Sequence, residues 1–265
     1  MKVIEGGISS VTSIRASGIY AGIKNQKKDL ALIVADPVSL ANPPIAAGGF
    51  TKNRVCAAPV WVCREHLQDP SVQSIVVNSG NANACTGDEG MSNARQMTEL
   101  TANALSIPSD QVLVCSTGVI GQQLPMDKIE AGIAEAATQL STTGGRDTAE
   151  AIMTTDTIPK EIAVEVEISG QPVRIGGTAK GSGMIAPNMA TMLGFITTDV
   201  VITPDLLQTC LSEANELSFN RITVDSDTST NDTVLLLATA SAEHPKIEST
   251  DDPAYQTFSR GLIYV

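Results

Sequence analysis

Thr191 is the residue of this sequence best placed to act as a nucleophile. The segment before it is bent, because Gly181 and Gly183 tolerate positive φ angles and Pro187 favours an extended conformation in the preceding residue. Residues 192–199, rich in Leu, Phe, Ile and Thr, predict a short strand. We therefore expect the Thr191 hydroxyl group at the mouth of a strand, held in place by its neighbours.

The sequence offers little histidine to activate such a hydroxyl group. Only His66 and His244 are present, and neither accompanies a G-x-S-x-G motif, so a Ser-His-Asp triad is not expected. A threonine can instead use its own α-amino group as the base, provided that the preceding peptide bond is cut. The small residue Ala190 makes the Ala190–Thr191 bond a candidate cleavage site, although a strand that simply begins with threonine is the alternative.

Composition excludes several classes of function. The chain has 265 residues, and 29 acidic against 17 basic side chains give it a net charge of −12, which argues against nucleic-acid binding. No apolar run reaches about 18 residues and the first twenty residues do not resemble a signal peptide, so we expect a cytoplasmic protein outside the membrane. The five cysteines lack C-x-x-C spacing, so we expect no metal site and buried, unpaired thiols.

Apolar patterns and turn residues predict alternating helices and strands. Residues 1–22 are expected to be irregular, and His66, beside Glu65, is expected on the surface. The expected strands span 29–35, 50–64, 74–77, 111–115, 161–168, 173–175, 192–199, 221–225 and 233–240. The expected helices span 88–105, 125–140, 148–154 and 203–217. Hairpins occur beside crossovers and no repeat or linker divides the chain, which favours a layered α+β fold.

Residues 180–199, Lys-Gly-Ser-Gly-Met-Ile-Ala-Pro-Asn-Met-Ala-Thr-Met-Leu-Gly-Phe-Ile-Thr-Thr-Asp, resemble the signature of a known family. This family contains the ornithine acetyltransferases (glutamate N-acetyltransferases) of arginine biosynthesis, the ArgJ family. The resemblance extends, in the family's order, to residues 78–85, 116–121, 153–156 and 223–232, and so covers essentially the whole chain.

The resemblance implies an αββα-type layered fold of the DmpA/ArgJ-like class with a self-processing threonine nucleophile. It implies that the precursor cuts itself between Ala190 and Thr191. Residues 1–190 would form an α chain and residues 191–265 the start of a β chain. Two α and two β chains would assemble into a heterotetramer. Family members continue for more than a hundred residues beyond this point, so the chain is expected to lack the remainder of β.

The resemblance also implies a reaction. Thr191 would take the acetyl group of N-acetylornithine and pass it to glutamate, without a cofactor and with acetyl-CoA left open as a co-substrate. Thr117 and Gly118 would form the oxyanion hole, and Thr154, Lys180 and Thr191 would contact substrate. A hydroxyl group and a backbone N–H at a turn after a buried strand are suitable donors to an oxyanion. From the residues alone, an ordinary strand-ending turn is the preferred interpretation of residues 117–118, and Lys180 can bind a carboxylate or be solvated.

Two other functions fit the same residues. An aminopeptidase with an N-terminal nucleophile would use the same threonine chemistry on peptides. A non-catalytic small-molecule-binding protein would use the glycine-rich segment 176–183 to hold an amino acid and cut no bond. That segment matches the spacing of neither a P-loop nor a dinucleotide-binding fingerprint.

Overall fold

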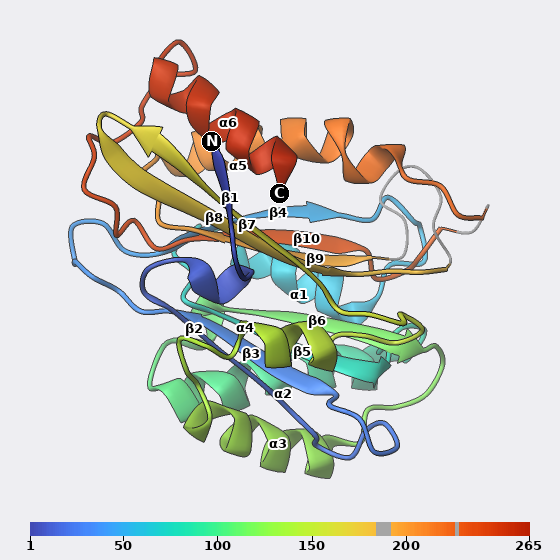
Figure 1. Ribbon diagram of the computed structural model, residues 1–265. Helices are drawn as coiled ribbons and strands as arrows, with labels where there is room; N and C mark the ends of the chain where they lie inside the picture. The colour runs from blue at the N-terminus through green and yellow to red at the C-terminus, as the bar shows by residue number, and fades with distance from the viewer. Residues whose placement is uncertain (184–191, 226–227) are drawn as a thin grey trace.

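Two β-sheets form the middle layers of the protein, and helices cover their outer faces (Figure 1). The computed structural model describes residues 1–183, 192–225 and 228–265. The larger sheet has six strands in the spatial order β1 (Lys2–Ile4), β7 (Lys160–Ile168), β8 (Gln171–Lys180), β9 (Leu193–Thr198), β10 (Thr233–Ala238) and β4 (Ile45–Phe50). The smaller sheet has four, in the order β2 (Ile14–Ile19), β3 (Leu30–Ala35), β5 (Ser74–Asn81) and β6 (Val112–Val119).

The helices divide between the two outer faces and the edges of the sheets. Helices α5 (Pro204–Leu217) and α6 (Pro253–Tyr264) cover the six-stranded sheet, and α2 (Gly87–Leu105) and α3 (Met126–Thr138) cover the four-stranded sheet (Figure 1). The shorter helices α1 (Ala58–His66) and α4 (Gly145–Ala151) each contact both sheets. Three 3₁₀ turns complete the described elements: η1 (Ile8–Ser10), η2 (Ser109–Gln111) and η3 (Phe219–Arg221).

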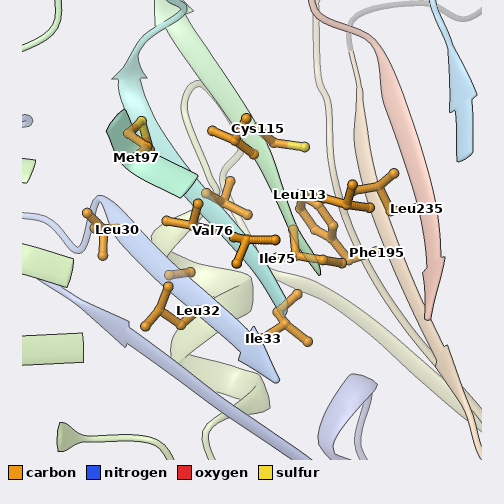
Figure 2. Close-up of a cluster of buried hydrophobic side chains, with 14 of the residues drawn as sticks. Leu30, Leu32, Ile33, Ile75, Val76, Met97, Leu113, Cys115, Phe195 and Leu235 are labelled. Carbon is orange, nitrogen blue, oxygen red and sulfur yellow. The ribbon is translucent and has the colours of Figure 1, made fainter. Parts of the chain in front are cut away.

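The main core lies where the two sheets face each other. Figure 2 shows Leu113 and Ile75 of the four-stranded sheet beside Phe195 and Leu235 of the six-stranded sheet, and all four side chains are buried. Every residue of β3 is buried, because this strand is covered on both faces and therefore has a continuous apolar sequence. A second core fills the space between the six-stranded sheet and helices α5 and α6.

The layered α+β fold expected from the sequence is confirmed, and most expected elements are present. The expected strands near residues 29–35, 74–77, 111–115 and 233–240 correspond to β3, β5, β6 and β10. The β7–β8 hairpin and helices α2, α3 and α5 also lie where the patterns indicate. Helix α6 was not expected from the sequence.

Several sequence predictions were wrong. Residues 50–64 are not one extended segment, because β4 ends at Phe50 and α1 begins at Ala58; a short apolar run does not distinguish a strand from a helix. Residues 1–22 are not irregular throughout, since β2 is a full strand despite its Arg, Ser and Gly residues. Residues 221–225 form no strand, and the 3₁₀ turn η3 extends to Arg221.

Side-chain burial also differs from expectation at three residues. Cys63, Cys115 and Cys210 are buried as expected, but Cys85 is exposed and Cys56 is only partly buried. His66 is not a free surface side chain, because its Nδ1 lies 2.8 Å from the carbonyl oxygen of Val112. It therefore links the end of α1 to the start of β6.

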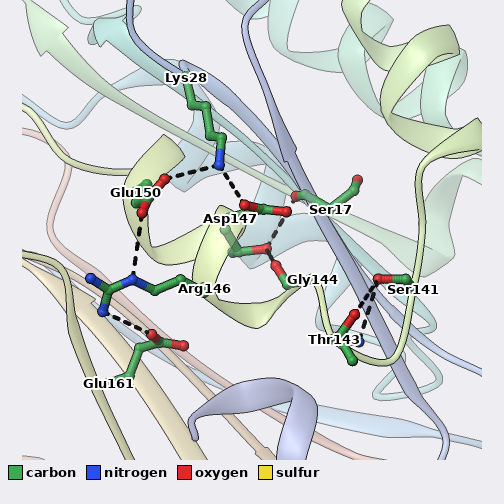
Figure 3. A network of polar contacts seen from close by, with 10 residues as sticks. Ser17, Lys28, Ser141, Thr143, Gly144, Arg146, Asp147, Glu150 and Glu161 are labelled. Atoms are coloured by element: carbon green, nitrogen blue, oxygen red, sulfur yellow. Dashed lines mark hydrogen bonds and ion pairs between the residues drawn. The ribbon is translucent and has the colours of Figure 1, made fainter.

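Helix α4 is fastened to the surrounding strands by polar contacts at its surface (Figure 3). Lys28 forms ion pairs with Asp147 and Glu150, and Arg146 contacts Glu161 of β7 at 3.4 Å. These groups are partly exposed, so each pair contributes little stability. The tighter constraint is steric: a Cβ atom at buried Gly18 of β2 would overlap the backbone carbonyl group of Asp147.

We expect Gly18→Ala to lower the free energy of unfolding by about 1–3 kcal/mol, because α4 must move away from β2 to admit the methyl group. Gly183→Ala is the matched control, since a Cβ atom there meets nothing within 4 Å. Urea unfolding followed by circular dichroism would measure both variants. Equal stability of the two variants would contradict the steric role of Gly18.

Candidate active site

A cavity of about 470 Å³ lies where ends of both sheets meet the loops at residues 24, 154–155 and 229–231. Thr117, Gly118, Thr154 and Lys180 all line it. These four residues come from separate parts of the sequence, and the fold brings them to one place. Ala190 and Thr191, the expected cleavage site and nucleophile, lie outside the described residues.

Thr117 and Gly118 occupy the end of β6, where its pairing with β5 becomes irregular. Gly118 lies opposite Gly80, and the register shifts directly after Gly80. The φ angle of Gly118 is +135°, and a Cβ atom there would overlap the carbonyl carbon of Gly80. Only glycine fits this close approach, and the bulge turns the strand end towards the cavity. The predicted oxyanion donors therefore lie in the constrained last residues of β6 itself, and not in a turn after the strand as the sequence suggested.

Lys180, at the end of β8, brings a buried positive charge to the same cavity. Its side chain is 3% exposed, and its Nζ donates a hydrogen bond to Thr117 Oγ1 at 3.3 Å. Burial lowers the pKa of Lys180, the nearby Lys160 acts in the same direction, and Asp156 and Asp232 oppose the shift. The contact joins the six-stranded sheet to the four-stranded sheet at the cavity wall.

Asp156 and Lys160 hold the backbone on which Lys180 sits. Asp156 Oδ1 accepts hydrogen bonds from the Gly181 amide at 2.8 Å and from Lys160 Nζ at 2.5 Å. Lys160 Nζ also donates to the Gly181 carbonyl oxygen at 3.2 Å. Burial opposes ionisation of Asp156, but the hydrogen bonds from Lys160 and Gly181 outweigh it and lower the pKa. Both sides of Gly181 are thus fixed, and Lys180 with them.

Asp232 is a buried acid that was not expected as a site residue from the sequence. Its side chain accepts a hydrogen bond at Oδ1 from the amide of Met192, the residue that follows Thr191, at 2.9 Å. Oδ2 has no hydrogen-bond partner among the described residues. Burial raises the pKa of Asp232 to about 7, against the opposing effects of the Met192 amide, the Ser229 side chain and the Lys180 charge. The position of Asp232 in the 223–232 motif was the only signal for it.

Asn231 anchors the neighbouring cavity wall. Its Nδ2 group donates to the carbonyl oxygens of Ala82 at 2.6 Å and Ser116 at 2.8 Å. Ala82 directly follows β5, Ser116 belongs to β6, and Asn231 shortly precedes β10. The Asn231 side chain is therefore a second link between the two sheets. The sequence predicted a turn here and did not single out Asn231.

Lys24 is a third site residue that the sequence did not single out. Its Nζ donates to the carbonyl oxygens of Met153 at 2.8 Å and Ala151 at 3.4 Å, at the end of α4. Burial lowers the pKa of Lys24 to about 8; Lys27 and Lys180 add to this shift, and Asp29 and Asp156 oppose it. Lys24 lies in a loop with no apolar period, which explains why sequence patterns missed it.

The described part of the chain contains neither a metal-binding cluster nor a membrane-spanning helix. Within residues 1–183, 192–225 and 228–265, no three His, Cys, Asp or Glu side chains are arranged to hold a metal ion. Nor does any helix in these ranges combine the length and apolar character needed to cross a bilayer.

A family model described as the ArgJ family matches residues 15–265. The chain belongs to the ArgJ family. The arginine biosynthesis bifunctional protein ArgJ of Symbiobacterium thermophilum is 51% identical over the whole of this chain, which spans 65% of that relative. The chain is therefore less than two thirds as long as this ArgJ protein.

Solved structures agree with the family assignment. The ornithine acetyltransferase of Mycobacterium tuberculosis, crystallised with ornithine, matches 70% of this chain and 97% of its own with a TM-score of 0.65 and 38% identity. An l-aminopeptidase d-ala-esterase/amidase from Ochrobactrum anthropi, described as a variant of the Ntn hydrolase fold, matches 97% of this chain and 82% of its own, with a TM-score of 0.56 and 12% identity. The second likeness shows the shared fold alone, which agrees with the expected DmpA/ArgJ-like class.

The raised pKa of Asp232 predicts a pH-dependent cost to stability. Because the folded-state pKa, about 7, exceeds the ordinary value of 3.8, the folded protein gains stability from the bound proton at low pH and loses it as the pH rises through 7. Asp232→Asn, which keeps an acceptor for Met192, should therefore be more stable than the unchanged protein at pH 8, by about 2 kcal/mol, and not at pH 4. Urea unfolding at both pH values measures this, and a pH-independent difference would contradict it.

Proposed function

We propose that this protein is an acetyltransferase of arginine biosynthesis that transfers acetyl from N2-acetyl-L-ornithine to L-glutamate. The observation that carries the proposal is the convergence of Thr117, Gly118, Thr154 and Lys180 on one cavity. A related protein crystallised with ornithine is itself named an ornithine acetyltransferase, which supports the same substrate class.

The geometry of Thr117 suits it to stabilise an oxyanion. Lys180 Nζ donates to Thr117 Oγ1, so the hydroxyl hydrogen of Thr117 remains available to a different acceptor. The Gly118 backbone can add an N–H at the same strand end. Two such donors would stabilise the tetrahedral oxyanion formed when the acetyl carbonyl is attacked, and the buried Lys180 charge would strengthen the Thr117 donor.

In the proposed reaction, the Thr191 hydroxyl oxygen attacks the acetyl carbonyl of N-acetylornithine. An ester bond to Thr191 forms, the amide C–N bond breaks, and the hydroxyl proton passes through the Thr191 α-amino group to the departing ornithine amine. Glutamate's amine then attacks the ester: the amide C–N bond of N-acetylglutamate forms, the ester C–O bond to Thr191 breaks, and a proton from the amine passes through the Thr191 α-amino group to the Thr191 oxygen. The ester supplies the transfer potential, so no cofactor is needed, and acetyl-CoA remains open as an additional co-substrate.

We further propose that the α-amino group of Thr191 arises by self-cleavage after Ala190. The resulting chains would be 1–190 and a second that begins at residue 191, assembled as two α and two β chains in the cytoplasm. Chain length supports this division. The crystallised M. tuberculosis chain, matched over 97% of its length, corresponds to 70% of this chain, which is about 186 of the 265 residues. That length is close to the proposed α chain.

Peptide hydrolysis by an aminopeptidase is not favoured by any specific observation. The aminopeptidase structure that this chain resembles is 12% identical and shares only the fold. A non-catalytic binding protein would need none of the processing proposed here, so the state of the Ala190–Thr191 bond separates it from both enzymes.

We expect the full-length protein to separate under denaturing conditions into two chains, one ending at Ala190 and the other beginning at Thr191. Thr191→Ala should remain a single chain, because it lacks the hydroxyl group needed for the N-to-O acyl shift. Intact mass spectrometry and N-terminal sequencing measure both proteins. A single uncut chain in the active, unmodified protein would refute the proposal.

We expect transfer of labelled acetyl from N-acetylornithine to glutamate with parallel double-reciprocal plots, since the acetyl group waits on the enzyme between substrates. Thr117→Ala should lower kcat about 100-fold with a smaller change in KM, because the lost hydrogen bond acts mainly in the transition state.

Thr155→Ala is the matched control, since Thr155 lines the same cavity but bonds to Ser182 rather than to Lys180. If the processed Thr117→Ala variant has an unchanged kcat, Thr117 has a structural role only and does not stabilise the oxyanion. Peptide hydrolysis without acetyl transfer would favour the aminopeptidase.

A further inference from the structure

The charged side chains on the cavity wall are all positive among the residues that the structure describes. Among the described residues that line the cavity, the charged side chains are Lys24 and Lys180, and the nearby acids Asp156 and Asp232 are not part of the lining. Lys180 is already placed as a substrate contact. Lys24 comes from a different element, the loop between β2 and β3, and the proposed reaction has so far given it no role.

The loop that carries Lys24 is held rigidly. The buried carboxylate of Asp29 accepts hydrogen bonds from the backbone amides of Ala21 and Lys24, both at 2.7 Å. The stem of Lys24 lies against Gly80, where a Cβ atom would come within 2.8 Å of Lys24 Cγ. The side chain is therefore directed past β5 towards the cavity before any ligand binds.

The ammonium group of Lys24 has donor capacity to spare. It donates to the carbonyl oxygens of Met153 and Ala151, and a third N–H has no acceptor among the described residues. Met153 directly precedes Thr154, a proposed substrate contact. A half-buried cation at this position favours an anionic ligand group, since a charge-assisted hydrogen bond would offset the cost of its burial.

The two substrates of the proposed reaction differ in side-chain charge. Both carry an α-carboxylate, which must lie near the reacting nitrogen because the two groups share one carbon atom. Glutamate carries a second carboxylate, whereas the ornithine side chain ends in an ammonium group. Lys180, bonded to Thr117, is the cation nearest to the proposed oxyanion donors and suits the α-carboxylate.

We infer that Lys24 binds the side-chain carboxylate of the acceptor amino acid and thereby selects glutamate over neutral amino acids of the same size. This inference rests on the proposed function, since it names the group that the acceptor presents in the same cavity. Lys24 also caps the carboxyl end of α4, so its test must distinguish recognition from a structural role.

Calorimetry on the full-length protein with glutamate and with glutamine provides that distinction, because the two ligands differ only in the side-chain carboxylate. The unchanged protein should bind glutamate at least about 10-fold more tightly than glutamine, a ratio typical of one charge-assisted hydrogen bond. Lys24→Met keeps the stem against Gly80 and should bring the two affinities within about 2-fold. Lys24→Arg should retain part of the preference.

Lys27→Met is the matched control for charge, since Lys27 is an exposed lysine of the same loop. Lys28→Met is the control for α4 docking, since Lys28 pairs with Asp147 and Glu150. Both should keep the preference for glutamate. If Lys24→Met weakens both ligands equally, or keeps the unchanged ratio, the inference is wrong.

A pH titration of the unchanged protein tests the same inference without a substitution. The groups that act on Lys24 are Lys27 and Lys180, which lower its pKa, and Asp29 and Asp156, which raise it, with a net value of about 8. Glutamate affinity should therefore fall relative to glutamine affinity between pH 7 and pH 9.5, as Lys24 loses its proton. A constant ratio over this range would overturn the inference.

Failure of the inference and failure of the proposed function are distinguishable. If acetyl transfer is absent but the preference for glutamate depends on Lys24, the recognition role stands and the reaction does not. A second outcome is that acetyl transfer occurs and Lys24→Met does not change the ratio of the KM for glutamate to the KM for N-acetylornithine. In that case the proposed reaction is supported and the recognition role of Lys24 is wrong.

Discussion

The contact between the Lys180 ammonium and the Thr117 hydroxyl group is the interaction on which the candidate site depends. A charged group that is 3% exposed is costly unless polar partners surround it, and Lys180 has Thr117 as a direct partner with Asp156 and Asp232 nearby. The ammonium therefore holds β8 and β6 in one relative position. Because these strands belong to different sheets, the cavity exists only when both sheets are packed together.

The other polar links serve the same geometry. Asp156 accepts a hydrogen bond from the Gly181 amide and Lys160 donates one to the Gly181 carbonyl oxygen. Asn231 joins the segment before β10 to the ends of β5 and β6. These bonds lie at the strand ends, where the apolar core between the sheets gives way to the cavity. The core supplies the cohesion of the two sheets, whereas the buried polar groups fix the orientation of their ends, since an unpaired partner would carry a large desolvation cost.

The sequence predicted those parts of the site that lie within local patterns. The buried strand that leads to Thr117 and Gly118 is visible in the sequence, although β6 continues through both residues where a turn was expected, and the Lys180 segment is visible by its glycines. Lys24 and Asp232 were not found, because their importance comes from burial beside residues far away in the chain. The same limit explains α1: Val60, Trp61 and Val62 suit a strand locally, but they belong to a helix that has Pro59 in its first turn and a buried face that contacts β6.

The charge balance of the site runs opposite to that of the whole molecule. A net charge of −12 repels anions at long range, but salt screens that field beyond about 8–10 Å of the surface. Lys24 is half-buried and Lys180 is buried in the cavity wall, and charges removed from bulk water are screened less. Asp29 and Asp156 oppose the lowering of the Lys24 pKa, and Asp156 and Asp232 oppose that of the Lys180 pKa, although none of these acids lines the cavity. A small amino-acid carboxylate that reaches the cavity therefore meets a local positive field, and the acidic surface does not prevent its binding.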